Sequence, residues 1–253
     1  GSPEIKLVNK QRIALLKGEG TSSLSYGAIW HFFEQQLHYP VTSIDTDGFN
    51  VDKLNSFDVL ILPSGWYGGV LNDNVMDDLK VWIRDGGKVI AFSGALRSFS
   101  GKDGFALKLN DADEDGENEE TENLTPYDQR ERESVKNFIT GSIYKVTLDP
   151  SHPMAFGYGD SYYSLKLGSS SYSFLDSGYN VGYIKGTPIS VSGFSGDTAK
   201  AGLENSLVFG ETRMGRGSVV YFVDDVMFRS FWENGKLFFV NSIFFVNNNK
   251  FRI

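Results

Sequence analysis

The chain contains no cysteine and only three histidines among its 253 residues, at His31, His38 and His152. The absence of cysteine excludes disulfides, thiolate metal sites and a cysteine nucleophile. No apolar run approaches the roughly 18 residues that cross a bilayer. Acidic residues outnumber basic ones, 32 against 24, for a formal net charge of −8. Because basic side chains also form no cluster, we expect neither nucleic acid nor a membrane as a partner.

What the chain does contain suffices for one large core, because 40% of its residues are hydrophobic and 14% are aromatic. Gly1 and Ser2 are typical of the remnant left after a purification tag is cleaved. We therefore expect residues 1–10 to be a tag remnant and linker, and residues 11–253 to form a single domain.

The first half alternates short apolar runs with amphipathic segments. This pattern predicts parallel strands joined by helices that cover both faces of the sheet. Ligands on such sheets bind beyond the carboxyl ends of the strands. Strands are expected at residues 12–16, 41–44, 59–62 and 89–92, and helices at 24–37 and 72–84.

The second half begins with a polar, acidic stretch at about 107–134 that reads as an insertion. Short runs rich in glycine, serine and tyrosine follow, and they predict antiparallel strands that extend or cover the sheet. A buried strand at 217–223 and a closing helix at 235–245 return to the α/β pattern. The antiparallel strands are expected at residues 142–148, 161–167, 180–184 and 203–210.

An apolar strand at residues 88–92 runs directly into Ser93, with Ala91 and Ala95 two residues away on either side. When a strand turns sharply into a helix, the side chain at the apex points out of the sheet, and its neighbours at i−2 and i+2 must be small. The segment therefore predicts a nucleophile elbow with Ser93 at its apex. The alternative is that the Ser93 hydroxyl only caps the following helix.

A serine hydroxyl becomes a nucleophile only beside a base. His152 is the candidate base, so Ser93, His152 and a carboxylate would together make a serine hydrolase. His152 lies between Pro150 and Pro153, and the alternative is that it is a histidine of a rigid turn.

The acidic insertion matches the calcium-loop pattern D-x-D-x-D-G-x5-E at Asp111, Asp113, Asp115, Gly116 and Glu122. Five oxygen ligands at this spacing would surround one calcium ion, which makes a calcium-stabilised structural domain one hypothesis. A solvated acidic loop is the alternative, because acidic runs reach such patterns by chance.

Two resemblances follow from these motifs. Residues 61–69 resemble the strand and glycine loop of the oxyanion hole in class I glutamine amidotransferases, and residues 89–96 resemble their nucleophile elbow, with Ser93 in place of cysteine. The end of the chain looks like that of the amidotransferase-like domain attached to secreted zinc carboxypeptidases of the M14 type. The segments that carry this second resemblance are 18–22, 149–158, 215–232 and 236–245.

The resemblance implies a three-layer, flavodoxin-like α/β fold with a mostly parallel sheet and a β-rich extension. In working amidotransferases a His-Pro-Glu sequence follows the last long strand, whereas this chain has Asp224 and Asp225 there. Neither can act as the imidazole base, so the triad is degenerate and no catalytic residue or metal is expected. The resemblance thus implies a non-catalytic accessory or interaction module of a larger, secreted or periplasmic zinc carboxypeptidase-like protein.

Whatever function remains is expected in a crevice at the carboxyl ends of the strands. Trp66 and Tyr67 would form an exposed stacking surface there, and the backbone amides of Gly65 and Gly94 would point into it. Expected partners are other domains of the parent protein and a peptide or carbohydrate ligand. The residues assigned to the crevice are Gly65, Trp66, Tyr67, Gly94, Arg97, Asp225 and Arg229.

Overall fold

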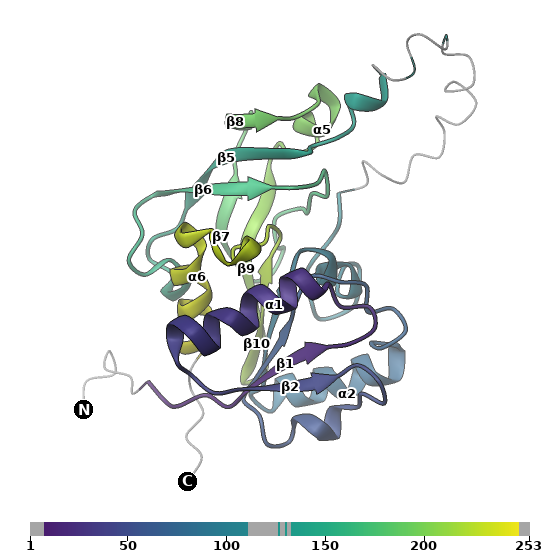
Figure 1. Cartoon of the computed structure of the whole chain (residues 1–253), viewed down its shortest axis with the longest axis vertical. Helices are drawn as coiled ribbons and strands as arrows, with labels where there is room; N and C mark the ends of the chain where they lie inside the picture. The colour runs from purple at the N-terminus through teal and green to yellow at the C-terminus, as the bar shows by residue number, and fades with distance from the viewer. Residues whose placement is uncertain (1–7, 111–125, 127–129, 131–132, 248–253) are drawn as a thin grey trace.

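The computed structural model describes residues 8–110, 126, 130 and 133–247, and these fold around one mixed sheet (Figure 1). The described strands follow the order β2-β1-β3-β4-β10-β9-β7-β5-β6, and β8 also pairs with β5. The strands are β1 (Ile13–Lys17), β2 (Val41–Asp45), β3 (Val59–Leu62), β4 (Lys88–Phe92), β5 (Gly141–Leu148), β6 (Ser161–Lys166), β7 (Tyr179–Ile184), β8 (Ile189–Phe194), β9 (Ser206–Met214) and β10 (Gly217–Phe222).

The helical segments connect these strands and close the chain. The longer ones are α1 (Ser23–His31), which continues as the π-helix η1 (Phe32–Leu37), α2 (Asp73–Arg84) and α6 (Glu233–Phe244). The shorter ones are η2 (Val51–Leu54), η3 (Ser93–Ser98), η5 (Pro153–Ala155), α5 (Asp197–Ala201) and η6 (Phe228–Ser230). Among the described residues, no helix has both the length and the apolar character that a membrane crossing requires.

The parallel half of the sheet is formed by the strands that the sequence predicted. Strands β2, β1, β3, β4 and β10 are parallel neighbours, and Ala14, Leu60, Val89 and Val219 lie side by side across four of them. The side chains of β3, β4 and β10 are buried throughout. Continuous burial is expected of a parallel sheet covered on both faces. The predicted three-layer α/β fold is confirmed.

Alternate side chains of each parallel strand enter two separate cores. On β1, Ile13 and Leu15 pack into the core covered by α1, η1 and α6, whereas Ala14 and Leu16 pack into the core covered by α2. Helix α2 has the predicted amphipathic character, and Asn72 caps it by accepting a hydrogen bond from the Val75 backbone N–H at 3.2 Å.

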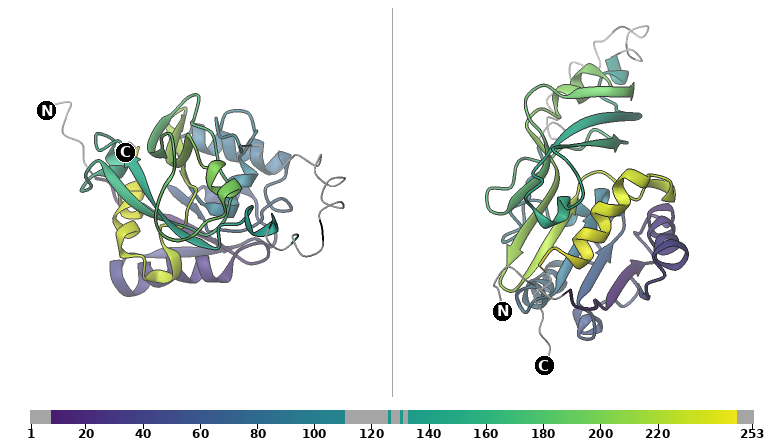
Figure 2. Two further views of the ribbon diagram at one scale, coloured as in Figure 1. Left: turned by 90° about the horizontal axis from the view of Figure 1, so that it is seen from above. Right: turned by 90° about the vertical axis from the view of Figure 1, so that its left-hand side faces the viewer.

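The second half extends the sheet with antiparallel strands, as expected, and Figure 2 shows this β-rich half projecting beyond the α/β half. Strand β8 and helix α5 were not predicted. Gly193 interrupts the apolar alternation of β8, and Ile189 and Val191 remain exposed, so the segment lacks the half-buried pattern of a typical strand. The acidic stretch that holds the calcium-loop residues Asp111, Asp113, Asp115 and Glu122 lies outside the described residues.

The predicted helix at 24–37 is one continuous helical segment, but its last turns widen into the π-helix. The segment ends at His38, which adopts the left-handed conformation with φ of 50°.

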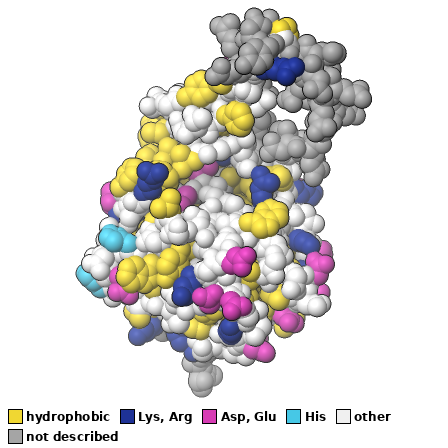
Figure 3. Space-filling view, turned by 45° about the vertical axis from the view of Figure 1, so that its right-hand side comes forward, with side chains coloured by type: hydrophobic (Ala, Val, Ile, Leu, Met, Phe, Trp, Pro, Cys, Tyr) yellow, Lys and Arg dark blue, Asp and Glu magenta, His cyan; other side chains and the backbone are white. Residues whose placement is uncertain are grey.

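Basic and acidic side chains are interspersed on the face of the molecule shown in Figure 3.

Candidate functional site

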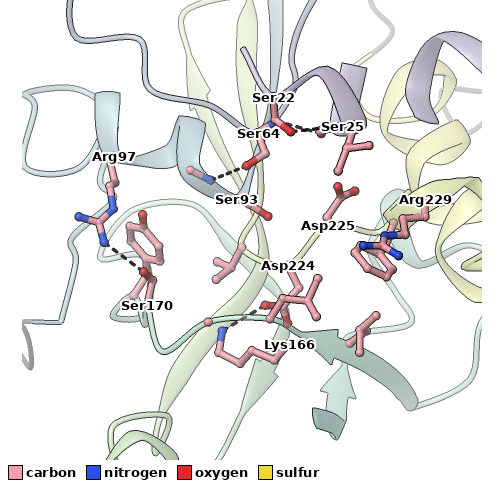
Figure 4. Close-up of a pocket in the computed structure, with 18 residues that line it drawn as sticks. Ser22, Ser25, Ser64, Ser93, Arg97, Lys166, Ser170, Asp224, Asp225 and Arg229 are labelled. Atoms are coloured by element: carbon pink, nitrogen blue, oxygen red, sulfur yellow. Dashed lines mark hydrogen bonds and ion pairs between the residues drawn. The ribbon is translucent and has the colours of Figure 1, made fainter. Parts of the chain in front are cut away.

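A cavity of about 320 Å³ opens at the carboxyl ends of the parallel strands, next to Ser93 (Figure 4). The loops after β1, β3, β4 and β10 all contribute to it, as the topology predicts, and the β-rich half supplies a further wall. The lining residues are Ser22, Leu24, Ser25, Ser64, Ser93, Gly94, Arg97, Leu165, Lys166, Leu167, Gly168, Ser170, Tyr172, Val223, Asp224, Asp225, Phe228 and Arg229.

Ser93 has the backbone geometry of a nucleophile elbow. Its φ angle is 43°, a left-handed value that few residues with a side chain adopt. The flanking Ala91 and Ala95 are both fully buried, so larger side chains would collide with the core. A Cβ atom at Gly94 would lie 2.9 Å from the Gly65 carbonyl oxygen, which explains why the next position is glycine. The sequence-based prediction of the turn therefore holds.

The conformation of Ser93 stores strain that glycine would relieve. We expect Ser93→Gly to raise the free energy of unfolding by about 1 kcal/mol, because a left-handed residue with a Cβ atom costs roughly that much. Ser93→Ala keeps the Cβ atom and serves as the matched control, with little change expected. Chemical denaturation of the three proteins measures the difference, and equal stability of the glycine and alanine variants would contradict the strained elbow.

The capping role considered for Ser93 is wrong. Phe92 occupies the N-cap position of η3, and no side-chain hydrogen bond caps this helix. The side chain of Ser93 makes no hydrogen bond within the described part of the chain, and Figure 4 shows it in the cavity. Its hydroxyl is therefore available to a ligand.

The expected pair of open backbone amides is not formed. The Gly94 N–H donates to the Ser64 hydroxyl at 3.3 Å, and the Ser64 N–H donates to the Ser25 hydroxyl at 3.0 Å. Gly65 packs against the loop after β1, where a Cβ atom would lie 2.2 Å from the Gly20 carbonyl oxygen, and it does not line the cavity. The Ser64 hydroxyl thus engages the Gly94 N–H, which is one of the two donors expected for an oxyanion hole.

His152 is not a base for Ser93. Its Nε2 atom lies 2.9 Å from the Glu211 carboxylate, and its Nδ1 atom accepts a hydrogen bond from the Met154 backbone N–H at 3.2 Å. The imidazole is buried and does not line the Ser93 cavity. With both ring nitrogens engaged elsewhere, the proposed pairing of Ser93 with His152 is wrong, and the turn interpretation of His152 holds.

Asp224 is tied to the β-rich half by a buried ion pair. One carboxylate oxygen accepts from the Lys166 ammonium at 3.1 Å and the other from the Ser164 hydroxyl at 2.6 Å (Figure 4). Both charged side chains of the pair are at most 8% exposed. Arg229, which also lines the cavity, forms no ion pair with Asp224 or Asp225 among the described residues. Asp224 therefore anchors strand β6 at the base of the cavity.

Asp225 is the carboxyl group of the cavity whose pKa is shifted. Burial raises the pKa of its carboxyl group to about 6, against the effect of hydrogen bonds from the Met227 backbone N–H and the Ser25 hydroxyl. The neighbouring Asp224 raises it further. Asp225 thus both caps a backbone turn and lines the cavity.

The expected aromatic surface is reduced to one residue. Tyr67 is fully buried, and its hydroxyl donates to the Pro63 carbonyl oxygen at 3.0 Å. Trp66 is 68% exposed but lies beside the cavity, in a second hollow of about 340 Å³ that also includes Arg97. Arg97 lies between the two spaces and donates to the Ser170 hydroxyl at 3.2 Å.

The sequence did not reveal the contribution of the β-rich half to the site. Lys166, Ser170 and Tyr172 line the cavity, yet they are about 70 to 80 residues from Ser93 in the chain. Only the alternation around Lys166, a charged residue in line with the inward-facing Tyr162 and Ser164, could have indicated a buried lysine.

Comparison with known proteins gives a fold but no close relative. No known protein family and no curated protein matches the chain. The solved structures that match include three with TM-scores between 0.53 and 0.56. One is a putative GMP synthase subunit from Thermoplasma acidophilum, which is 11% identical, with 93% of this chain and 94% of that chain covered and a TM-score of 0.55.

The other two are putative ThuA-like proteins. The one from Parabacteroides merdae is 14% identical, covers 89% of this chain and 88% of its own, and has a TM-score of 0.56. The one from Bacteroides uniformis is 13% identical, with 96% and 94% covered and a TM-score of 0.53. The chain has a class I glutamine amidotransferase-like fold. This likeness concerns the fold alone, and the chemistry of this amidotransferase-like chain depends on its own residues.

Proposed function

We propose that this amidotransferase-like domain is a non-catalytic module that binds a ligand in the Ser93 cavity. The proposal rests on the two residues that follow β10, at the position where a catalytic base would lie. Asp224 is held there in a buried ion pair with Lys166, and Asp225 accepts hydrogen bonds from Ser25 and Met227. No histidine lines the cavity within the described part of the chain.

The chemistry of serine supports this proposal. A hydroxyl group ionises far above pH 7, so it attacks a carbonyl only when an adjacent base removes its proton. The Gly94 N–H, an expected oxyanion donor, is also engaged, because it donates to the Ser64 hydroxyl. An acyl-transfer enzyme needs both elements together. A cavity nevertheless remains open at the carboxyl ends of the strands, where ligands of such sheets bind.

The biological context belongs to the same proposal. The resemblance of residues 215–232 and 236–245 to the end of the amidotransferase-like domain of secreted M14-type zinc carboxypeptidases supports a place in a larger, exported peptidase-like protein. In such a protein the domain would contact the peptidase domain and present its cavity to a peptide or a carbohydrate. Sequencing the complete gene tests this context, and a protein without any peptidase domain would contradict it.

The purified protein is expected to release no ammonia from glutamine and to hydrolyse no activated ester such as p-nitrophenyl acetate above the buffer rate. Ser93→Ala should give the same background rates, because the unmodified protein is expected to have no turnover that depends on Ser93. Coupled ammonia detection and absorbance at 405 nm measure the two reactions. Turnover by the unmodified protein that Ser93→Ala abolishes would contradict the proposal.

A further inference from the structure

Two arginine side chains line the Ser93 cavity, and neither has a carboxylate partner among the described residues. Arg97 donates to the Ser170 hydroxyl at 3.2 Å, and the guanidinium of Arg229 lies 5.3 Å from the centre of the Phe228 ring. Lys166, which also lines the cavity, is neutralised by Asp224. The cavity thus exposes two positive charges that form no ion pair among the described residues, in a protein whose net charge is −8.

The two guanidinium groups lie on opposite sides of the cavity, with Ser93 and Asp225 between them (Figure 4). Each comes from a different loop at the carboxyl edge of the sheet, because Arg97 follows β4 and Arg229 follows β10. One small anion would meet one of these groups, whereas an elongated ligand with a charge at each end would meet both.

The backbone at Arg229 has an energetically unfavourable conformation. Arg229 and Ser230 are consecutive left-handed residues, with φ angles of 47° and 62°, and neither is glycine. The Ser230 hydroxyl lies 3.0 Å from Nδ1 of His31, which ties this turn to helix α1. Strained residues persist where the surrounding structure fixes them, and they concentrate at ligand-binding sites. The strained turn at Arg229 therefore supports a binding role for this side chain.

The space between the arginines carries polar groups that suit the middle of a small ligand. The Ser93 hydroxyl has no hydrogen-bond partner in the described structure and points into the cavity, while Ser22 contributes a second hydroxyl to the lining. The volume of about 320 Å³ is at the small end of the range for small-molecule sites. The cavity fits a compact polar molecule rather than a folded partner.

We propose that the cavity binds a small dicarboxylate, with one carboxylate at Arg97 and the other at Arg229. Arginine suits this role because its planar guanidinium can pair with a carboxylate through two parallel hydrogen bonds. A dicarboxylate is favoured over inorganic phosphate because its two charges are separated and can each pair with one arginine, whereas a compact phosphate would meet only one of them beside the Asp225 carboxyl group. The inference depends on the proposed function, since it names the ligand class of the same cavity.

Isothermal titration at constant ionic strength tests the proposal with malonate, succinate, glutarate and adipate. Butyrate, inorganic phosphate and 1,4-diaminobutane serve as a singly charged, a compact and a positively charged comparison. We expect one length of dicarboxylate to bind at least tenfold more tightly than butyrate, because only a dicarboxylate engages both arginines. Arg97→Gln and Arg229→Gln should each weaken its binding about tenfold or more.

Arg216→Gln is the matched control, because Arg216 pairs with the exposed Asp85 at the opposite end of β10 and should leave binding unchanged. Thermal melting of each variant verifies its fold, and Arg229→Lys replaces Arg229→Gln if the latter is unfolded. Lysine keeps the charge and loses the planar fork, so weaker binding is again expected.

Dicarboxylates that bind no better than butyrate, or that bind equally well after both arginine replacements, would overturn the inference. Tighter binding of phosphate or of 1,4-diaminobutane than of every dicarboxylate would also overturn it, and the cavity would then remain a binding site for another ligand class. Ester turnover at Ser93 would instead contradict the proposed function, and the titrations would still report the ligand class independently.

Discussion

Replacing Lys166 with methionine is expected to lower the free energy of unfolding by about 3–5 kcal/mol. The replacement leaves the Asp224 carboxylate buried with only the Ser164 hydroxyl as its side-chain donor, and an uncompensated buried charge costs about that much. Because this ion pair joins strand β6 to the loop after β10, we also expect the β-rich wall of the cavity to loosen. Urea denaturation measures the first effect, and hydrogen exchange of residues 161–170 measures the second.

The double variant Lys166→Met/Asp224→Asn distinguishes the cost of an unpaired buried charge from the cost of lost packing around the two side chains. Removing both charges at once leaves no buried ion, so we expect it to recover more than half of the lost stability. A matched exposed pair is Lys102 with Asp73, where Lys102→Met should change stability by less than about 1 kcal/mol. Additive effects of the two single replacements at 166 and 224 would contradict a coupled buried pair.

Stability is also expected to rise by about 2 kcal/mol between pH 7 and pH 9 because of one buried lysine. Burial lowers the pKa of Lys88 to about 7, while the more distant Glu211 and Asp58 act in the opposite direction. Above pH 7 the folded protein then binds fewer protons at this amine than the unfolded chain, whose lysine ionises near 10.5. Raising the pH therefore favours the folded state until the unfolded lysine also loses its proton.

Lys88→Met isolates this contribution. The Lys88 amine donates to the Ser242 and Ile243 carbonyl oxygens at 2.9 and 2.8 Å, near the end of α6, so the replacement also removes two hydrogen bonds. We expect it to destabilise the protein at every pH and to flatten the rise between pH 7 and pH 9. Denaturation curves across this range measure both effects, and an identical pH dependence in the two proteins would contradict a neutral Lys88.

The parallel half of the fold was predictable because its signals are local. Each strand is a continuous apolar run, and α2 carries both a capping asparagine and a glycine stop. Strand β8 escaped prediction because its side chains remain largely exposed. The boundary of β9 was also placed too early, since its buried residues continue through polar positions such as Glu211 and Thr212.

The sequence predicted the place and the backbone geometry of the site but not the partners of its side chains. Four of the residues assigned to the crevice line the cavity, namely Gly94, Arg97, Asp225 and Arg229. The elbow at Ser93 depends on its immediate neighbours Ala91 and Ala95, which the sequence displays directly. The partners of each side chain depend on residues far away in the chain. His152 meets Glu211, 59 residues further on, and Asp224 meets Lys166, 58 residues earlier. Such pairings follow from the arrangement of the β-rich half, which periodicity alone does not determine.

The most direct test of a non-catalytic Ser93 is the intact mass of the protein after incubation with a fluorophosphonate. This reagent forms a covalent bond with a serine only where the hydroxyl is activated by a neighbouring base. We predict an unchanged mass, equal to that of Ser93→Ala treated in the same way. A single adduct on Ser93 that is absent from Ser93→Ala would contradict the account and identify the domain as a serine enzyme.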